Sequence, residues 1–285
     1  MQSFIDYLKE SDASPHTIKS YISDLKKFMK WYVETTGEEL KDFNAVGSLH
    51  VAEFKRYLIT RGQKPATINR ALAALSVFFS WLTNQGLADQ NPVIGIISVK
   101  QERTSPKALD RREQMALMKA VRSSGKVRDI ALVTLLLHTG LRISELCALD
   151  VEDMVLRERS GWLTVMGKGL KVRTVPLNAT VRNALEAWLK VRGRADGPLF
   201  TSQKKGGLTA RAVEYLLAKY ARLARLEGVT PHSLRHTFCK SLIDAGESID
   251  RVAMLAGHSN LNTTSRYTRP TDKDLQNTVD KLAWE

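Results

Sequence analysis

The hydrophobic positions of residues 1–90 recur with the period of an α-helix. Apolar residues follow Ser14-Pro15 at three- and four-residue steps, and the same spacing recurs over 49–61 and 65–86. Each interval therefore has one apolar stripe. Ser14 is suited to cap the first long helix and Pro15 to its first turn. With a short helix at the N-terminus, the pattern predicts a four-helix bundle.

This pattern stops at Asn91. Residues 91–107 combine glycine, β-branched and charged residues without helical periodicity, which predicts an extended linker between two domains. Helical periodicity then returns after Asp110. Because 285 residues are enough for two domains, we expect a second domain over 108–285.

Residues 150–178 have a pattern typical of strands. Two runs rich in β-branched residues, 162–166 and 172–177, flank Gly167-Lys168-Gly169, which predicts a β-hairpin or a small sheet. The chain is therefore expected to be mainly α-helical with a small β-sheet. Further helices are predicted over residues 179–192, 209–226, 233–245 and 249–255.

The charge of the chain favours polyanionic partners. The net charge is +13 and the sequence pI about 9.8. Residues 1–100 carry 12 Lys and Arg against 10 Asp and Glu, so +11 of this charge falls on residues 101–285. Such an excess attracts nucleic acid, although basicity alone would fit an ordinary basic protein equally well.

Several classes of protein are disfavoured by what the sequence lacks. Cys147 and Cys239 do not make a disulfide framework or a zinc motif, and a reducing cytosol suits them. There is no signal-peptide pattern and no apolar run of 18 residues. No phosphate-binding GxxxxGK[ST] loop occurs, so no nucleotide cofactor is expected. We therefore expect a cytoplasmic protein that has no membrane partner.

Three separated motifs supply a candidate chemistry. Arg142 lies in Thr139–Leu146, Arg235 follows His232, and Tyr267 follows His258. Two guanidiniums can clamp the oxygens of a phosphodiester while a tyrosine attacks phosphorus. A lone arginine or tyrosine usually has a structural role, but this combination favours phosphoryl transfer without a metal.

These motifs resemble the tyrosine recombinase family, and its Xer-like branch in particular. The likeness also includes Gly167-Lys168-Gly169 with the following Lys171 and Arg173, and it covers nearly the whole chain. It implies an N-terminal SAM-like core-binding domain, a C-terminal catalytic domain and a site-specific DNA recombinase. The enzyme would cut and rejoin strands through a 3′-phosphotyrosyl ester and a Holliday junction.

The resemblance also implies a role for each residue of the site. Tyr267 would be the nucleophile, Arg142 and Arg235 the phosphate clamp, and Lys168 the general acid for the departing 5′ oxygen. Lys171 is the nearest rival for that acid, and the spacing by itself leaves both open.

Two histidines and a glutamate complete the expected site. His232 would accept the tyrosine proton or bind a phosphate oxygen, and His258 would donate to the phosphate. Glu145 would orient Arg142 by an ion pair. A metal site is disfavoured because these histidines lack further ligands at short spacing, and a packing role is expected for His236.

DNA contacts are expected from both domains. The resemblance implies a C-shaped clamp around a duplex carrying a specific core site. Candidate contacts for the phosphate backbone and grooves, each weighed against a solvated surface position, are Lys64, Arg70, Lys171, Arg173 and Arg211.

Residues 271–285 carry Leu275, Val279 and Leu282 at helical spacing. In the family such a helix docks on the next subunit of a tetramer on two DNA sites, either a homotetramer or a heterotetramer with a related recombinase. The sequence is compatible with docking in cis and in trans. The sequence leaves open whether an accessory protein or accessory DNA sites control the direction of exchange.

Three alternatives remain at this point. A type IB topoisomerase-like enzyme would keep the chemistry without strand exchange. A DNA-binding or architectural protein would have an idle site, and a helical adaptor would leave the motifs unexplained. The DNA target and the choice among resolution, integration and excision stay open.

Overall fold

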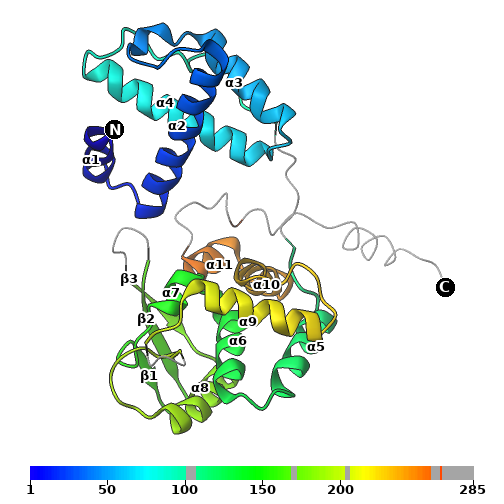
Figure 1. Cartoon of the computed structure of the whole chain (residues 1–285). Helices are drawn as coiled ribbons and strands as arrows, with labels where there is room; N and C mark the ends of the chain where they lie inside the picture. The colour runs from blue at the N-terminus through cyan, green and yellow to red at the C-terminus, as the bar shows by residue number, and fades with distance from the viewer. Residues whose placement is uncertain (101–106, 168–171, 203–205, 258–263, 265–285) are drawn as a thin grey trace, which may run out of the picture. The chain divides into compact units, whose positions relative to one another are not determined.

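The chain forms two compact units, Met1–Arg103 and Thr104–Glu285. The computed structural model describes residues 1–100, 107–167, 172–202, 206–257 and Thr264. Within these ranges the protein is mainly helical and has one three-stranded antiparallel sheet (Figure 1). The expected fold class is confirmed.

The N-terminal unit is the predicted helical bundle. Ser14 caps its longest helix, because the Ser14 Oγ accepts a hydrogen bond from the Thr17 amide over 3.1 Å. A short 3-10 turn, η1 (Phe43–Ala45), lies between the second and third helices. The four helices are α1 (Gln2–Glu10), α2 (Pro15–Thr36), α3 (Ser48–Thr60) and α4 (Pro65–Asn84).

Aromatic side chains fill the core of this unit. Phe4 packs edge-on against Phe78 with ring centroids 5.0 Å apart, and Phe28 packs in the same way against Phe54 at 5.1 Å. All four side chains are buried. Each contributes about 1.5–3 kcal/mol of transfer free energy, so the apolar stripes of the sequence account for the bundle.

The first part of the predicted linker packs on the N-terminal unit. Asn69 of α4 donates to the Val99 carbonyl at 2.9 Å and accepts from the Val99 amide at 2.8 Å. Lys55 of α3 donates to the Ile97 carbonyl. Residues 91–100 therefore pack against α3 and α4. The hydrophobic periodicity of the sequence does not predict this packing, because it depends on hydrogen bonds from helix side chains to the backbone of this segment.

The C-terminal unit begins with three helices that lead into a sheet. They are α5 (Arg111–Arg122), α6 (Val127–Thr139) and α7 (Ile143–Cys147). The sheet consists of β1 (Met154–Leu156), β2 (Gly161–Met166) and β3 (Val172–Pro176). The described part of the unit continues with α8 (Ala179–Arg192), α9 (Ala210–Leu223), α10 (Pro231–Asp244) and α11 (Ile249–Ala256).

The sheet has the order β1-β2-β3. The expected pairing of β2 with β3 is present, with Val165 opposite Arg173. β1 was not anticipated, because three residues are too few to give a recognisable alternation. Leu163, Val165 and Val175 are buried, so one face of the sheet belongs to the core.

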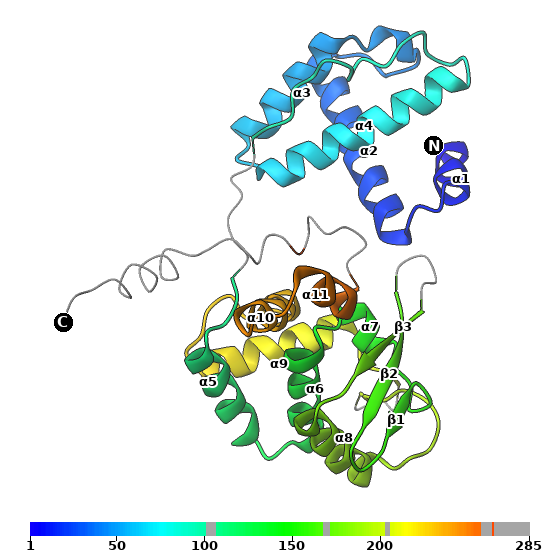
Figure 2. The same cartoon turned by 180° about the vertical axis from the view of Figure 1, so that it is seen from behind.

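Helix α6 is the centre of the C-terminal unit. It is buried along most of its length and packs against α5, α8 and α10. Figure 2 shows the sheet beside α6 and α8, with α7, β3 and α11 close together at one end of the unit. That end brings together the segments that carry the motif residues.

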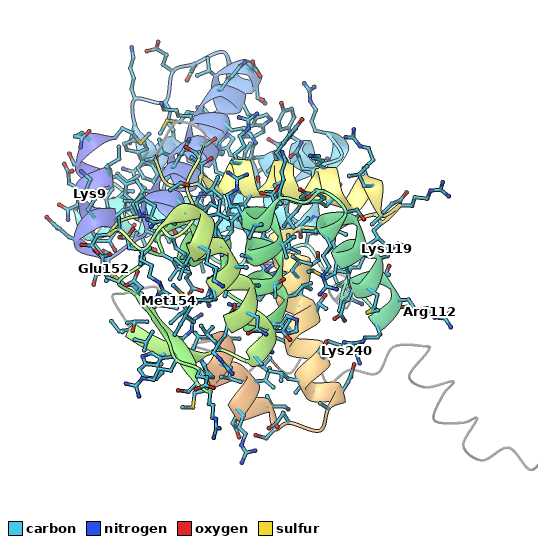
Figure 3. The ribbon with its side chains drawn as sticks, turned by 90° about the horizontal axis from the view of Figure 1, so that it is seen from below. Lys9, Arg112, Lys119, Glu152, Met154 and Lys240 are labelled. Carbon is cyan, nitrogen blue, oxygen red and sulfur yellow. The ribbon has the colours of Figure 1, made fainter. Side chains whose placement is uncertain are left out.

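The exposed face of α5 carries basic side chains. Figure 3 shows Arg112 and Lys119 of α5 pointing away from the body of their unit, and both are exposed. Among the described residues no helix is long and apolar enough to cross a membrane.

Candidate active site

Arg142 is placed by the turn that ends α6. Gly140 has a left-handed backbone with φ of +61°, and a Cβ there would lie only 2.4 Å from Cδ1 of Phe238. Glycine is therefore required both by conformation and by space. The chain then starts α7, and Arg142 is its N-cap residue.

Glu145 holds Arg142 through both its backbone and its side chain. Its carboxylate accepts from the Arg142 amide at 2.7 Å and from Arg142 Nη1 at 2.9 Å. Arg142 Nη2 donates to the carbonyl of Gly257 at 2.7 Å. The Arg142 side chain is still 39% exposed, so part of its guanidinium can reach a ligand. The geometry supports the expected orienting role of Glu145.

The carboxylate of Glu145 has a second arginine partner. Arg173 on β3 donates from Nη1 at 2.7 Å and from Nη2 at 2.9 Å. Burial raises the pKa of Glu145, but the hydrogen bonds from Arg173 and Arg142 outweigh it, so the pKa lies below the ordinary 4.5. Glu145 is therefore ionised at neutral pH.

Arg235 of α10 is buried beside this group. Its Nη1 donates to the Gly140 carbonyl at 2.6 Å and its Nη2 to the Ala256 carbonyl. Burial, followed by the charge of Arg142, lowers the pKa of Arg235 from 12.5 to about 10. The group stays charged at neutral pH, so Arg142, Arg173 and Arg235 together outweigh the charge of Glu145.

The two histidines of α10 lie against each other. The rings of His232 and His236 are 3.9 Å apart at their centroids, in an edge-on arrangement. His232 is exposed in the first turn of α10, whereas His236 is buried. Thr230 caps this helix by accepting from the Ser233 amide at 3.0 Å. The cap fixes where α10 begins, and with it the position of His232 in the first turn of the helix.

Four predicted site residues lie outside the described residues, namely Lys168, Lys171, His258 and Tyr267. The described chain directly adjoins three of them, Lys168, Lys171 and His258. β2 and β3 pair up to Met166 and Val172, and Gly257, with a left-handed φ of +66°, is the C-cap residue of α11. The assignments of these four residues stay predictions.

Three other predicted DNA contacts belong to the N-cap of α4, to α4 itself and to α9. Lys64 is the exposed N-cap residue of α4, and Arg211 is exposed in the first turn of α9. Arg70 of α4 donates to the buried carboxylate of Asp24 at 2.8 and 3.1 Å. Arg70 therefore has a structural partner, although its side chain is 46% exposed.

The ion pair between Arg173 and Glu145 is not predicted by the spacing of the motifs. A signal for it was present, because alternate residues of a strand share a face. Arg173 lies two positions before Val175, and Val175 is buried. That spacing points the side chain of Arg173 inward, away from a surface contact with DNA.

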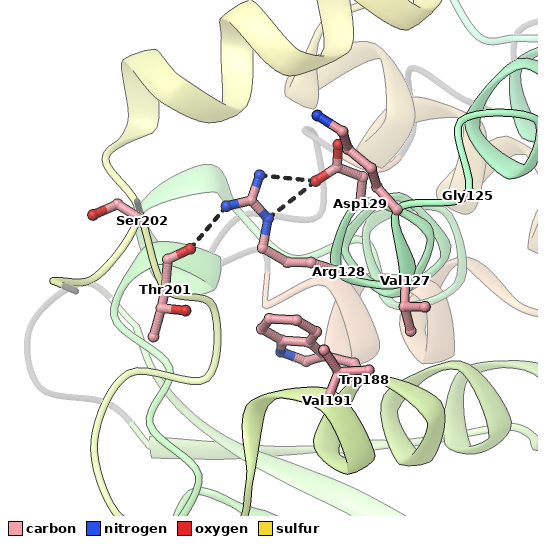
Figure 4. A pocket seen from close by; sticks show the side chains of 9 residues that line it. Gly125, Val127, Arg128, Asp129, Trp188, Val191, Thr201 and Ser202 are labelled. Carbon is pink, nitrogen blue, oxygen red and sulfur yellow. Dashed lines mark hydrogen bonds and ion pairs between the residues drawn. The ribbon is translucent and has the colours of Figure 1, made fainter. Parts of the chain in front are cut away.

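A cavity of about 420 Å³ lies far from this group along α6. Its lining includes Arg128 and Asp129 at the start of α6, whereas Arg142 follows the end of α6. Figure 4 shows Arg128 bonded to Asp129 and to the backbone of Thr201. These contacts occupy the guanidinium, so the cavity is not part of the candidate site. Among the described residues no cluster of three or more metal-ligating side chains occurs.

Family models match both units. Residues 107–274 match the model described as the phage integrase family, and residues 1–86 match its N-terminal SAM-like domain. Tyrosine recombinase XerC of Myxococcus xanthus is 37% identical over 286 residues, covering 95% of this chain and 92% of the relative. A tyrosine recombinase of Pseudothermotoga lettingae is 35% identical over 290 residues, covering 100% and 98%.

Solved recombinase structures share the fold. The XerH site-specific recombinase in a post-cleavage complex with palindromic difH substrate has a TM-score of 0.78 and 25% identity. That match covers 94% of this chain and 80% of XerH. A lambda integrase dimer bound to a COC′ core site has a TM-score of 0.75 over 100% of this chain and 96% of its own. At 18% identity the lambda integrase match supports the fold alone.

Proposed function

The chain belongs to the phage integrase family and is a site-specific tyrosine recombinase, and we propose that Tyr267 is its nucleophile. The Tyr267 oxygen attacks a phosphodiester of duplex DNA, forms a 3′-phosphotyrosyl ester and releases a 5′ hydroxyl. Attack by the 5′ hydroxyl of a partner strand on this ester rejoins DNA and frees the tyrosine. Because the ester retains the energy of the broken bond, neither cleavage nor rejoining consumes a nucleotide.

The observation that carries this proposal is the arginine group around Glu145. The transition state of phosphoryl transfer places negative charge on the non-bridging oxygens. Arg142 and Arg235 lie where chain segments more than ninety residues apart meet, and both are held by carbonyl oxygens. Guanidinium groups fixed in this way need little rearrangement to bind a phosphate.

The remaining groups move protons and bind the phosphate. Lys168 protonates the departing 5′ oxygen, with Lys171 as the alternative acid. His232 accepts the proton of Tyr267 or binds a phosphate oxygen, and its exposed place in the first turn of α10 supports this role. His258 donates to the phosphate. The chain follows α11 directly into His258, so Arg142 and His258 are linked through Gly257.

The substrate is double-stranded DNA with a specific core site. The relatives at 30% identity or more are named tyrosine recombinases, and XerH has been seen on its difH substrate. The charge of +11 on residues 101–285 supports a DNA backbone as the partner. Lys64, Arg70 and Arg211 contribute contacts in the two units, and Lys171 lies close in sequence to the catalytic lysine.

Recombination proceeds in a tetramer on two DNA sites. Four copies of this chain, or two pairs with a related recombinase, exchange strands through a Holliday junction. Residues 271–285 form the helix that docks on the neighbouring subunit. Since the substrate is chromosomal, plasmid or transposon DNA, the enzyme works in the cytoplasm at the nucleoid.

The test uses a DNA duplex recovered from a random-sequence pool by its binding to this chain. A nick is placed at successive positions, so that cleavage releases a short piece and traps the covalent product. Wild type, Tyr267→Phe and Tyr215→Phe are incubated with it in EDTA. Tyr215 is the matched control because it is an exposed tyrosine of the same unit.

We expect an SDS-stable adduct from wild type and Tyr215→Phe, and none from Tyr267→Phe. An adduct from Tyr267→Phe would assign the nucleophile to another residue. Specific binding without an adduct in any variant, at every nick position, would overturn the proposed chemistry.

A further inference from the structure

The carboxylate of Glu145 is shared by two guanidiniums. Oε1 accepts from Arg142 Nη1 at 2.9 Å and from Arg173 Nη1 at 2.7 Å. Oε2 accepts from the Arg142 amide at 2.7 Å and from Arg173 Nη2 at 2.9 Å. Arg173 makes the parallel two-bond contact, which is the stronger geometry for such a pair. The charge of Arg173 alone is enough to balance Glu145.

The two arginines differ in how accessible they are. The side chain of Arg173 is 15% exposed and that of Arg142 is 39% exposed, whereas the side chain of Glu145 is 3% exposed. A ligand arriving from solvent therefore meets Arg142 first. Because the charge of Arg173 offsets that of Glu145, the positive charge of Arg142 is not neutralised and can attract that ligand.

Arg173 also supports the end of α11. A Cβ at Gly257 would lie 2.8 Å from Cζ of Arg173, so the Gly257 backbone is packed closely against this guanidinium. The carbonyl of the same glycine accepts from Arg142 Nη2 at 2.7 Å. Arg173 thus touches the segment that leads into His258 as well as the carboxylate that holds Arg142.

Strand β3 links this contact to the hairpin. Arg173 is the second residue of β3 and pairs with Val165 of β2. The chain between β2 and β3 contains Lys168 and Lys171. A fixed Arg173 therefore fixes the base of the segment that carries the proposed general acid.

We infer that Arg173 is a positioning residue of the recombination reaction, which balances Glu145 so that Glu145 holds Arg142 without neutralising it. The inference rests on the proposed role of Arg142 as part of the phosphate clamp. It gives Arg173 a different task from the DNA contact that the sequence suggested. Lysine would be a poor substitute, since a single ammonium cannot make the planar two-bond contact.

The test separates DNA binding from cleavage. Arg173→Gln and Arg173→Lys are compared with wild type on the nicked duplex selected by binding, under single-turnover conditions. We expect Arg173→Gln to slow adduct formation about 10- to 100-fold, with the Kd for the same duplex changed only a few-fold. Arg173→Lys should fall between Arg173→Gln and wild type.

A second substitution tests the charge balance itself. In the Arg173→Gln background, Glu145→Gln removes the carboxylate that would otherwise neutralise Arg142. We expect it to restore part of the lost cleavage rate there, and to slow cleavage in the wild-type background. Opposite signs in the two backgrounds are the mark of coupled residues. Slowing by a similar factor in both backgrounds would overturn the inference.

Controls cover folding and total charge. Arg159→Gln removes a positive charge from an exposed position between β1 and β2, at the end of the sheet away from Arg173, and should cleave at the wild-type rate. Thermal unfolding of the full chain shows whether each variant is folded, and Arg173→Lys carries the test if Arg173→Gln is not. A large loss of affinity by Arg173→Lys with an unchanged cleavage rate would assign Arg173 to DNA binding and overturn the inference.

Failure of the proposed function gives a different result. If the chemistry is wrong, wild type itself forms no adduct and the Tyr267→Phe comparison fails. If only the inference about Arg173 is wrong, wild type forms an adduct that depends on Tyr267 and Arg173→Gln cleaves as fast as wild type.

Discussion

The guanidinium of Arg235 donates a hydrogen bond to the carbonyl oxygen of Gly140 over 2.6 Å, although 95 positions separate the two residues. Gly140 follows α6, and the other acceptor of Arg235 is Ala256 at the end of α11. The C-terminal ends of helices carry partial negative charge and unpaired carbonyl groups. Two helix ends therefore stabilise the buried charge of Arg235.

The turn at Gly140 is expected to tolerate no side chain. Gly140→Ala must adopt a φ of +61° and place its Cβ against the Phe238 ring. We expect a loss of about 2–4 kcal/mol in the free energy of unfolding, from backbone strain and overpacking together. Urea denaturation of the full chain measures it.

The control for this turn is Gly125→Ala. Gly125 has a similar φ of +65°, but no atom lies within 4 Å of its added Cβ. We expect it to lose only about 1 kcal/mol from backbone strain. Equal losses at both glycines would show that the Phe238 contact is unimportant.

Glu145 should make the free energy of unfolding depend on pH in the acidic range. Its folded pKa is lower than its ordinary 4.5, so its contribution is complete above pH 4.5 and is lost as pH falls through the folded pKa. The difference in unfolding free energy between wild type and Glu145→Gln should therefore shrink as pH falls from 7 to about 3. Denaturation curves across this range measure it.

The exposed Glu152→Gln substitution is the matched control for the acid dependence. Its difference from wild type should stay small throughout. If the Glu145→Gln difference grew with falling pH, the pairing of Glu145 with the two arginines would not lower its pKa as described.

The ion pair of Arg70 with Asp24 is expected to stabilise the N-terminal unit. The Asp24 side chain is 1% exposed, so Arg70→Ala leaves a buried carboxylate without its cation. We expect a loss of about 1–3 kcal/mol, below the usual range for buried pairs because Arg70 is partly exposed. Chemical denaturation followed by tryptophan fluorescence measures it, since Trp31 and Trp81 belong to this unit.

Arg56→Ala is the control for this pair, because Arg56 is an exposed residue of α3. It should change the unfolding free energy by less than about 0.5 kcal/mol. A similarly small effect of Arg70→Ala would instead point to a role for Arg70 in DNA binding alone.

Asn69 should hold residues 91–100 on the N-terminal unit. Asn69→Ala removes the hydrogen bond that its side chain accepts from the Val99 amide, and the one that it donates to the Val99 carbonyl. We expect the Val99 amide to exchange its hydrogen about 10- to 100-fold faster, from the loss of about 1–3 kcal/mol of local stability. Hydrogen exchange followed by NMR measures this amide directly.

Asn84→Ala is the comparison for Asn69, because Asn84 is the exposed last residue of the same helix. It should leave the exchange of Val99 unchanged. Unchanged exchange in Asn69→Ala would mean that apolar packing of this segment is sufficient to hold it.

Local rules of sequence were enough to predict most of the secondary structure. The stripe after Ser14 predicted a helix that the structure gives as Pro15–Thr36, with the expected cap. The two β-branched runs predicted the pairing of β2 with β3. Each of these elements could be predicted because periodicity, capping and turn formation depend on a few neighbouring residues.

Residue types in ordered motifs also predicted a tyrosine recombinase. The family comparisons confirm that assignment. The spacing within α7 was enough to suggest that Glu145 orients Arg142. Which other group would reach Glu145 was not contained in that spacing, because Arg173 comes from a strand 28 positions away.

The amino-acid sequence alone thus determined the helices, the pairing of β2 with β3 and the basic charge, and it predicted a set of residues that would bind phosphate. Tertiary structure decided that Arg173 balances Glu145, that Gly140 and Ala256 hold Arg235, and that residues 91–100 pack on α3 and α4. The physical reason is that buried charges and backbone groups must find partners. Which partners they find depends on how distant segments meet in space.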